Sequence, residues 1–301
     1  MLEKNKLSSK FHPSVFIIGA QKSGTTSIYQ WLKQDDRLEF PKIKETHYFT
    51  SNYQNGLSWY LSLYKKNFSD SIRCEVDPSY IFYNIAIERI LNLNKNAKFI
   101  IILRSPLQRA YSHYLMSVYR GYEKFSFPES ILLEKNRLLQ DAHSYDNFSY
   151  LKRGEYANQL KILLSKTESC LFLKFDDLYL NSNKILSLKK IYNFLGLSFV
   201  NNIDLGLSAN NAKEYKSKVF TNILYSDNLI RFIFRKIVPS TICRFKIKSF
   251  LDRLNSQKLS NTKLTYNEIL KLIPVEYINW HNAEVEKSSK ITKLNLTDWI
   301  I

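Results

Sequence analysis

The sequence predicts an α/β fold in which helices flank a central parallel sheet, followed by a mostly helical C-terminal part. Short apolar segments at Val15–Gly19, Lys98–Leu103 and Cys170–Phe175 have the length and unbroken hydrophobicity of buried parallel strands. Segments with apolar residues at helical spacing alternate with them, which is typical of βαβ units. From about Ile185 onward the pattern becomes mostly helical.

Length and composition favour one domain. The chain has 301 residues, of which 45% are hydrophobic, enough to bury one large core. Glycine and proline, with seven residues each, are too scarce to suggest long flexible linkers. We therefore expect a single domain over residues 1–301, in which residues 1–14 form a flexible N-terminal segment.

The first strand, Val15–Gly19, ends in glycine and is followed by a loop and a helix over Thr25–Lys33. Ile72–Val76 is expected to add a strand. After Lys98–Leu103, a helix is expected from Pro106 to about Tyr119, because proline suits the first helical turn. The remaining expected helical segments are Glu155–Lys166, Tyr192–Leu195, Asn222–Ile237 and Leu264–Glu286.

The net charge of +17 favours anionic partners such as a nucleotide, a polyanionic glycan, nucleic acid or an anionic membrane surface. A solvated lysine-rich surface explains the same charge. Cys74, Cys170 and Cys243 lie far apart in the sequence, which argues against a disulfide framework and against a zinc site. We expect no metal.

Residues 1–14 contain no apolar signal-peptide core, and the longest apolar runs are far too short to span a bilayer. We therefore expect a cytoplasmic protein of bacterial type without a transmembrane segment.

The stretch from Gly19 to Ser27, GAQKSGTTS, lies between a predicted strand and a predicted helix, the setting of a phosphate-binding loop. Gly19 and Gly24 have the Walker A spacing, but Thr25 stands where that motif requires lysine. This disfavours a Walker-type ATPase, although a nucleotide kinase with a degenerate loop stays an alternative. The expected phosphate-binding residues are Lys22, Ser23, Gly24, Thr25, Thr26 and Ser27.

The loop resembles the QKxGTT motif of PAPS-dependent sulfotransferases, where PAPS is 3′-phosphoadenosine-5′-phosphosulfate. The resemblance implies the P-loop-like sulfotransferase fold, and that Lys22 stabilises charge on the bridging oxygen while sulfur is transferred. The segment after the strand Lys98–Leu103 resembles the family's second motif, LRxPxxRAxSxY. By that resemblance Arg104 and Ser112 bind the 3′-phosphate.

The acceptor side is expected between the two nucleotide motifs. The segment Lys44-Glu45-Thr46-His47-Tyr48-Phe49 resembles the KExHFF segment of heparan-sulfate-type and bacterial sulfotransferases. The resemblance implies that Glu45 is the general base and that His47 assists or positions the acceptor. A surface ion pair would explain Glu45 without any catalytic role. The later segment Glu75–Tyr80 resembles one that lines the family's acceptor cleft; there Asp77 is either a further polar contact or the cap of a turn.

Further matches are weaker. Arg153 and Tyr156 fit an RGxY element that bacterial members place near the nucleotide, and Lys216 and Lys218 fit a basic loop that closes over PAPS. Both lysines are otherwise ordinary exposed residues. The resemblance implies a sulfotransferase that moves a sulfuryl group from PAPS to a hydroxyl or amine of a glycan, glycolipid or small molecule. The sequence is also compatible with a polyanion-binding protein and with a catalytically silent member of this fold.

Overall fold

The computed structural model describes residues 12–65, 71–178, 181–206, 213–225, 233–234, 236–238, 240–258 and 265–301. The chain divides into two compact units, each built from separate segments. We call Met1–Ser105, Glu155–Ala209 and Asn282–Ile301 the sheet unit, and Pro106–Gly154 and Asn210–His281 the helical unit. The expectation of one domain over the whole chain stays a prediction.

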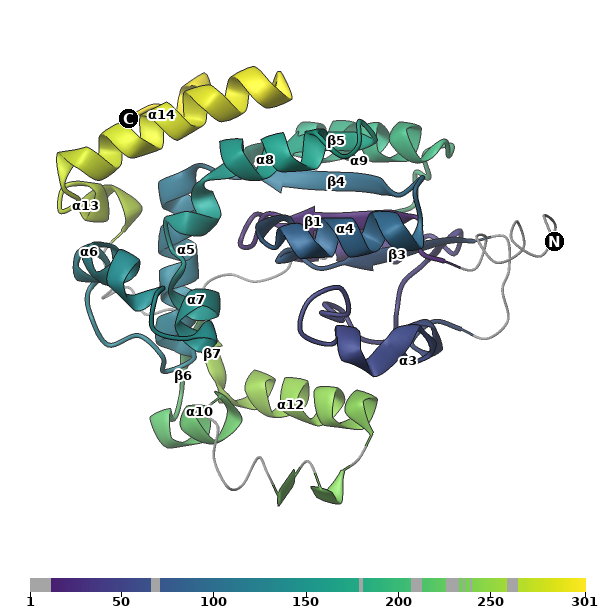
Figure 1. The fold of residues 1–301 in the computed structure, drawn as a ribbon, viewed down its shortest axis with the longest axis horizontal. Coiled ribbons are helices and arrows are strands. Elements are labelled where there is room, and N and C mark those ends of the chain that lie inside the picture. Colours follow the sequence, from purple (N-terminus) through teal and green to yellow (C-terminus); the bar gives the residue numbers. More distant parts are fainter. Residues whose placement is uncertain are drawn as a thin grey trace. The chain divides into compact units, whose positions relative to one another are not determined.

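The sheet unit contains a five-stranded parallel sheet in the order β2-β3-β1-β4-β5 (Figure 1). Val15 at the start of β1 lies opposite Cys74 on β3 and Lys98 on β4, so β1 pairs with a neighbour on each side from its first residue. The strands are β1 (Val15–Gly19), β2 (Leu38–Glu39), β3 (Ile72–Val76), β4 (Lys98–Leu103) and β5 (Cys170–Lys174).

Alternate residues of the strands face opposite sides of the sheet, and both faces are buried. Ile17 and Ile100 belong to a core that also contains Trp31 of α2 (Thr25–Leu32) and Tyr192 of α9 (Asn181–Leu195). On the other face Phe16 stacks on Phe99, with 6.1 Å between ring centroids. The unit also contains α3 (Gly56–Ser62), α4 (Asn84–Leu93) and α8 (Tyr156–Leu164).

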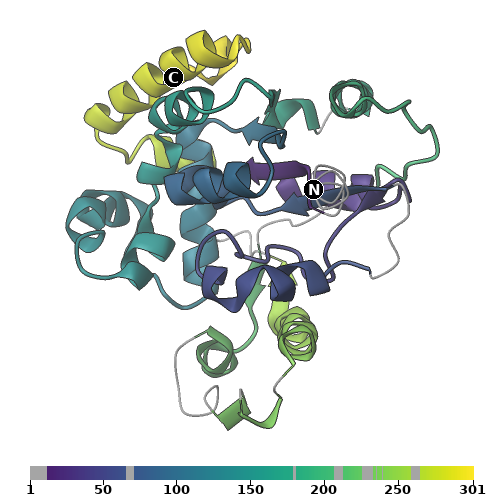
Figure 2. The ribbon, with the colours of Figure 1, turned by 45° about the vertical axis from the view of Figure 1, so that its right-hand side comes forward.

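The last segment of the sheet unit packs against parts of the unit that precede it in the sequence. The boundary between the units falls within α14 (Val275–Thr292), whose end lies beside α8 in both ribbon views (Figures 1 and 2). There the backbone N–H of Ala157 donates to Oε1 of Glu284 over 2.5 Å. Further on, the indole N–H of Trp299 donates to Asp176 over 2.7 Å, and Asp298 pairs with Lys174.

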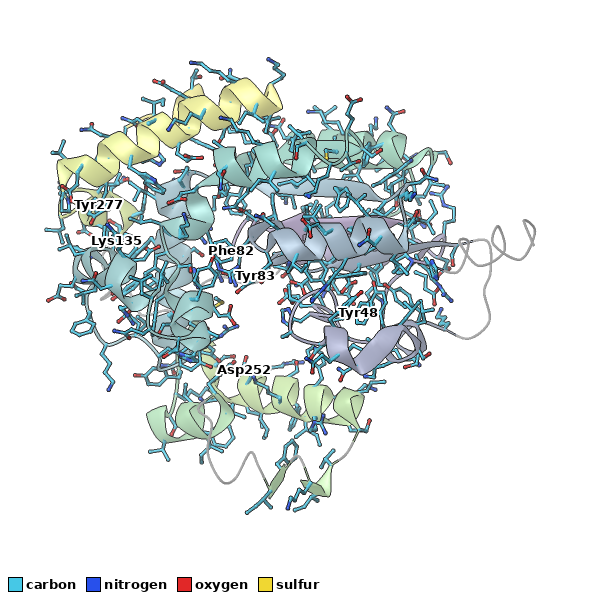
Figure 3. All side chains as sticks on the ribbon, viewed as in Figure 1. Tyr48, Phe82, Tyr83, Lys135, Asp252 and Tyr277 are labelled. Atoms are coloured by element: carbon cyan, nitrogen blue, oxygen red, sulfur yellow. The ribbon has the colours of Figure 1, made fainter. Side chains whose placement is uncertain are left out.

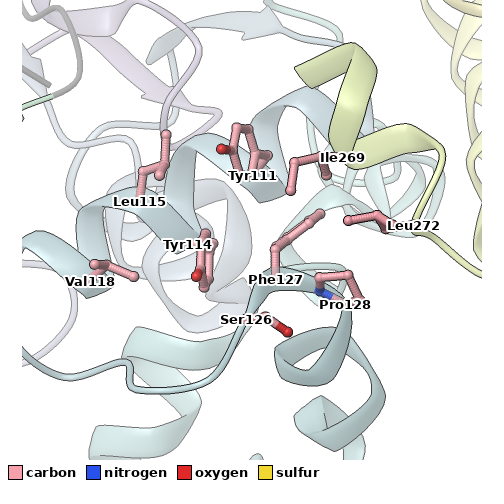
Figure 4. Close-up of a pocket in the computed structure, with 9 residues that line it drawn as sticks. All are labelled: Tyr111, Tyr114, Leu115, Val118, Ser126, Phe127, Pro128, Ile269 and Leu272. Atoms are coloured by element: carbon pink, nitrogen blue, oxygen red, sulfur yellow. The ribbon is translucent and has the colours of Figure 1, made fainter. Parts of the chain in front are cut away.

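The helical unit has its own core, to which α5 (Pro106–Tyr119), α6 (Phe127–Arg137) and the segment around Ile269 contribute. An apolar cavity of about 210 Å³ lies between these elements, lined among others by Tyr111, Phe127 and Leu272 (Figure 4). The helical unit also contains α7 (Ala142–Phe148), β6 (Lys213–Tyr215), α10 (Lys218–Tyr225), α12 (Thr241–Asn255), β7 (Ser256–Lys258) and α13 (Tyr266–Leu270).

The predicted α/β fold is confirmed. Strands Val15–Gly19, Ile72–Val76 and Lys98–Leu103 and the helix Pro106–Tyr119 have the predicted bounds. The third predicted strand ends at Lys174, one residue early, because Phe175 opens a short 3-10 turn.

Two C-terminal segments predicted to be helical differ from the prediction in their bounds. The segment Leu264–Glu286, expected to be helical, contains two helices, α13 and the first part of α14. Pro274 separates them, since proline disfavours helical backbone in the residue before it. Residue 264 lies outside the described residues. Of the helix expected over Asn222–Ile237, the start belongs to α10, which ends at Tyr225, and residues 226–232 lie outside the described residues.

Candidate active site

The loop between β1 and α2 follows a tight path at the carboxyl edge of the sheet. The N–H of Ala20 donates to the carbonyl of Ile102 on β4 over 2.8 Å, which ties the loop to the neighbouring strand. Gly24 is left-handed, with φ of 83°, and a Cβ there would lie 3.1 Å from Cδ1 of Leu178. Glycine is therefore the residue that this position accepts without a shift of its neighbours.

The N-terminus of α2 is suited to an anion. No side chain caps it, and its first turn carries no acidic residue, so the helix presents its positive end without an internal counter-charge. Within the described residues, the hydroxyl oxygen of Ser23 is buried and has no hydrogen-bond partner. Thr25 and Ser27 are buried and Thr26 is half-buried. This donor set fits a phosphate or sulfonate group.

The second nucleotide motif meets the first in the sheet unit. Arg104, which follows β4, donates from Nη1 to the backbone carbonyl of Lys22 over 3.1 Å. Its guanidinium lies over the ring of Phe175, 4.3 Å from the centroid. The hydroxyl of Tyr156, at the start of α8, donates to the carbonyl of Arg104 over 2.9 Å. The structure thus brings Lys22, Arg104 and Tyr156 together.

Four further predicted nucleotide-binding residues belong to the helical unit. Ser112 lies on α5 and is half-buried, whereas Arg153 is buried in a short 3-10 turn. Lys216 is exposed, and its N–H donates to the carbonyl of Asn255 over 2.7 Å. Lys218 is the first residue of α10. The roles of these four residues stay predictions.

The predicted acceptor residues lie in the segment after β2. The N–H of Glu45 donates to the carbonyl of Val76 at the end of β3 over 3.1 Å. The Glu45 carboxylate forms an ion pair with the neighbouring Lys44 and is partly exposed. Tyr48 lies beside α3 (Figure 3), and its ring stacks on that of Tyr60 with 4.3 Å between centroids. This aromatic contact anchors the segment.

His47 is held by Asp77. Nδ1 of His47 lies 2.7 Å from Oδ2 of Asp77, which is completely buried. The same oxygen accepts the backbone N–H of His47 over 3.1 Å. The charge of Asp77 raises the pKa of His47 to about 9, with further support from its hydrogen bond and from Glu45 and Glu75, against the opposing effect of burial.

Glu75 is a buried acid that the sequence did not mark as important by itself. It accepts hydrogen bonds from the hydroxyls of Thr46, Tyr60 and Tyr80, the last over 2.9 Å. Burial raises the pKa of Glu75 to about 7. Its position inside the predicted strand Ile72–Val76 could have revealed it. A carboxylate that is buried in a strand needs hydrogen-bond donors from other segments.

Backbone conformation singles out three of the predicted catalytic residues. Within the described part of the chain, four non-glycine residues have positive φ, and three of them are Lys22 (71°), Glu45 (60°) and His47 (50°). Residues in this sparsely populated region gather at functional sites, where the surrounding structure imposes the conformation. The phosphate loop and the acceptor segment share this property.

The fold and the loop define a P-loop-like α/β protein whose loop at the carboxyl edge of the parallel sheet is suited to an anion. The family follows from comparison with known proteins. The chain belongs to the sulfotransferase domain family, whose model matches residues 12–237.

Curated relatives carry the same family name. The chain is 29% identical over 189 residues to heparan sulfate glucosamine 3-O-sulfotransferase 3B1 of Mus musculus, a match that covers 63% of this chain and 47% of that protein. It is 34% identical over 109 residues to the membrane-associated sulfotransferase kil1 of Dictyostelium discoideum, covering 35% of this chain and 23% of that protein. The chain thus matches less than half the length of these relatives.

A solved structure supports the fold. The sulfotransferase from Alicyclobacillus acidocaldarius superposes with a TM-score of 0.66 at 21% identity, and the match covers 96% of this chain and 98% of that one. In the part of the chain that the structure describes, no helix has the length and hydrophobicity needed to cross a membrane. The same residues contain no group of three or more His, Cys, Asp or Glu side chains placed to hold a metal ion.

Proposed function

We propose that this protein transfers a sulfuryl group from PAPS to a hydroxyl or amine of an acceptor molecule. The observation that carries the proposal is the contact between the two nucleotide motifs, in which Arg104 donates to the carbonyl of Lys22. One motif is expected to bind the 5′-phosphosulfate and the other the 3′-phosphate. Their contact near the ends of β1 and β4 supports a site that binds both ends of one adenosine bisphosphate.

PAPS supplies an activated sulfuryl group whose leaving group is a phosphate. The N-terminus of α2 and the hydroxyls of Thr25, Thr26 and Ser27 are proposed to hold that phosphate. Lys22 is proposed to stabilise the negative charge on the bridging oxygen. Arg104, with Ser112 of the helical unit, is proposed to bind the 3′-phosphate, and Arg153, Tyr156, Lys216 and Lys218 are proposed to complete the nucleotide site.

On the acceptor side, Glu45 is proposed to take the proton of the attacking hydroxyl or amine. The acceptor that carries this hydroxyl or amine is proposed to be a glycan, a glycolipid or a small molecule. The names of curated relatives state that they act on heparan sulfate glucosamine, and the net charge of +17 suits an anionic glycan. A metal-independent reaction and a cytoplasmic location are part of the proposal.

Replacement of Lys22 by alanine tests it. We expect Lys22→Ala to lose PAPS-dependent sulfation by about 100-fold or more, because one oriented charge contact in the transition state is removed. Sulfation would be measured with labelled PAPS and a panel of glycans and small acceptors, with the product identified by mass spectrometry. Lys33→Ala, at an exposed position just after α2, is the matched control and should retain activity.

Binding of PAP, the desulfated product, is measured on the same variants by calorimetry. Wild-type protein that binds neither PAPS nor PAP would refute the proposal. Wild-type turnover by Lys22→Ala would refute the role of Lys22.

A further inference from the structure

Three consecutive residues of the acceptor segment are held by three consecutive residues at the end of β3. The N–H of Glu45 donates to the carbonyl of Val76. The hydroxyl of Thr46 donates to the carboxylate of Glu75. His47 bonds to Asp77 through both its backbone N–H and its ring. The conformation of residues 45–47 is therefore imposed by residues 75–77.

Asp77 is itself rigidly held. Its N–H donates to the carbonyl of Ile17 on β1 over 3.1 Å, and its side chain is 0% exposed. The two carboxylate oxygens have separate tasks: Oδ1 accepts the N–H of Ser79 over 3.1 Å, and Oδ2 accepts both groups of His47. Asp77 thus caps the following turn and orients His47 at the same time.

We propose that Asp77 is a positioning residue that fixes the His47 ring as a cationic hydrogen-bond donor beside Glu45. The inference deepens the proposed function and rests on it. With Nδ1 committed to Asp77, Nε2 is the ring nitrogen that can donate to an acceptor molecule. His47 then cannot serve as the base, which leaves that task to Glu45.

The charges around His47 support this division of roles. Asp77, Glu45 and Glu75 are the acidic groups that act on it, and together they favour the imidazolium. An imidazolium has no lone pair with which to take a proton.

Asp77→Asn is the direct test, because asparagine keeps an oxygen that can accept the Ser79 N–H while it removes the charge opposite His47. The matched control is Asp35→Asn, which removes another buried carboxylate of the sheet unit. Asp35 pairs with Arg37 at 2.7 Å and accepts the hydroxyl of Tyr192, and neither of these contacts involves the acceptor segment.

Two readouts are combined. The first is the titration of His47, followed by NMR in the intact chain of residues 1–301 with PAP bound. We expect its midpoint to fall from about 9 toward 6.5 in Asp77→Asn and to stay unchanged in Asp35→Asn. The second is steady-state kinetics, in which we expect kcat to fall at least about tenfold in Asp77→Asn while PAP affinity is retained.

A double variant separates positioning from simple destabilisation. If Asp77 acts through His47, Asp77→Asn should have no further effect on kcat in a His47→Gln background. Full additivity of the two changes would overturn the proposal, as would an unchanged His47 titration in Asp77→Asn.

Failure of the proposed function gives a different result. Suppose that the protein binds PAP and that the His47 titration shifts as expected in Asp77→Asn, but that no sulfuryl group is transferred. This result would refute the proposed activity and would leave the positioning role of Asp77 intact.

Discussion

Glu75 is a buried acid on β3 whose protonation depends on its surroundings. Its carboxylate is completely buried and surrounded by hydroxyl groups, and burial raises its pKa from 4.5 to about 7. Three donors lower the energetic cost of its charge without removing it. The residue therefore links the geometry of the acceptor segment to pH.

The direction in which stability changes with pH follows from which state binds the Glu75 proton. Between pH 4.5 and 7 the folded protein holds the Glu75 proton and the unfolded chain does not, so the free energy of unfolding falls as pH rises through this window. We expect this group to contribute a loss of about 3 kcal/mol across it. In Glu75→Gln that contribution should disappear, as measured by urea unfolding at pH values on either side of the window.

The control for this measurement is Glu88→Gln, at an exposed position on α4. It should retain the wild-type difference between the two pH values. A Glu75→Gln protein with that same difference would show that Glu75 titrates normally in the folded state.

At the level of elements, the start of α2 depends on glycine. In Gly24→Ala the left-handed backbone costs about 1–2 kcal/mol, and the added Cβ meets Leu178 at 3.1 Å and Phe175 at 3.3 Å. We expect thermal unfolding at a lower temperature and PAP binding weakened at least about tenfold, because the phosphate loop must shift to make room.

Gly56, at the start of α3, provides the control. Its φ is 79°, and a Cβ there would meet no atom within 4 Å. Gly56→Ala therefore carries the backbone strain alone and should leave PAP affinity unchanged. Equal loss of PAP affinity in both variants would mean that strain, and not the shape of the phosphate loop, governs binding.

The sequence could predict the elements whose signal is local. β1, β3 and β4 are mostly apolar runs, and Pro106 marks the start of α5, so these bounds agree with the structure. β2 has only two residues, Leu38–Glu39, and exists because it pairs with β3, a long-range contact that no local pattern reveals. α4 and α6 were also not expected.

In the candidate site, too, some features have a local sequence pattern and others depend on long-range contacts. The phosphate loop could be found because its residues are adjacent in sequence, and Arg104 because it follows a strand. The pairing of His47 with Asp77 joins residues that are 30 positions apart, and it depends on how the segment after β2 folds back on β3. A pattern of residue types does not contain that information.

On the scale of the whole molecule, the chain passes between the two units after residues 105, 154, 209 and 281. The single domain predicted from the sequence rests on its length and on its scarce glycine and proline, seven residues each, and it stays a prediction. The sheet unit is completed by residues 282–301, which contact Ala157, Lys174 and Asp176.

Removal of residues 282–301 should therefore destabilise the sheet unit. The truncated protein loses the Glu284–Ala157 and Trp299–Asp176 hydrogen bonds and the buried Trp299 side chain, and losses of this kind cost several kcal/mol. We expect a markedly lower unfolding temperature by circular dichroism. Trp299→Phe, which keeps an aromatic ring and loses the N–H, should show a smaller decrease; an unfolding temperature equal to that of the wild type in the truncated protein would contradict this.

The late closing segment also bears on how the protein is made. During translation, β1 to β5 leave the ribosome well before residues 282–301. The nascent sheet therefore lacks its contacts with residues 282–301 while residues 210–281 of the helical unit are synthesised. Over that interval the carboxylate of Asp176 lacks its indole donor and the surface that Trp299 later covers stays open to solvent and to chaperones.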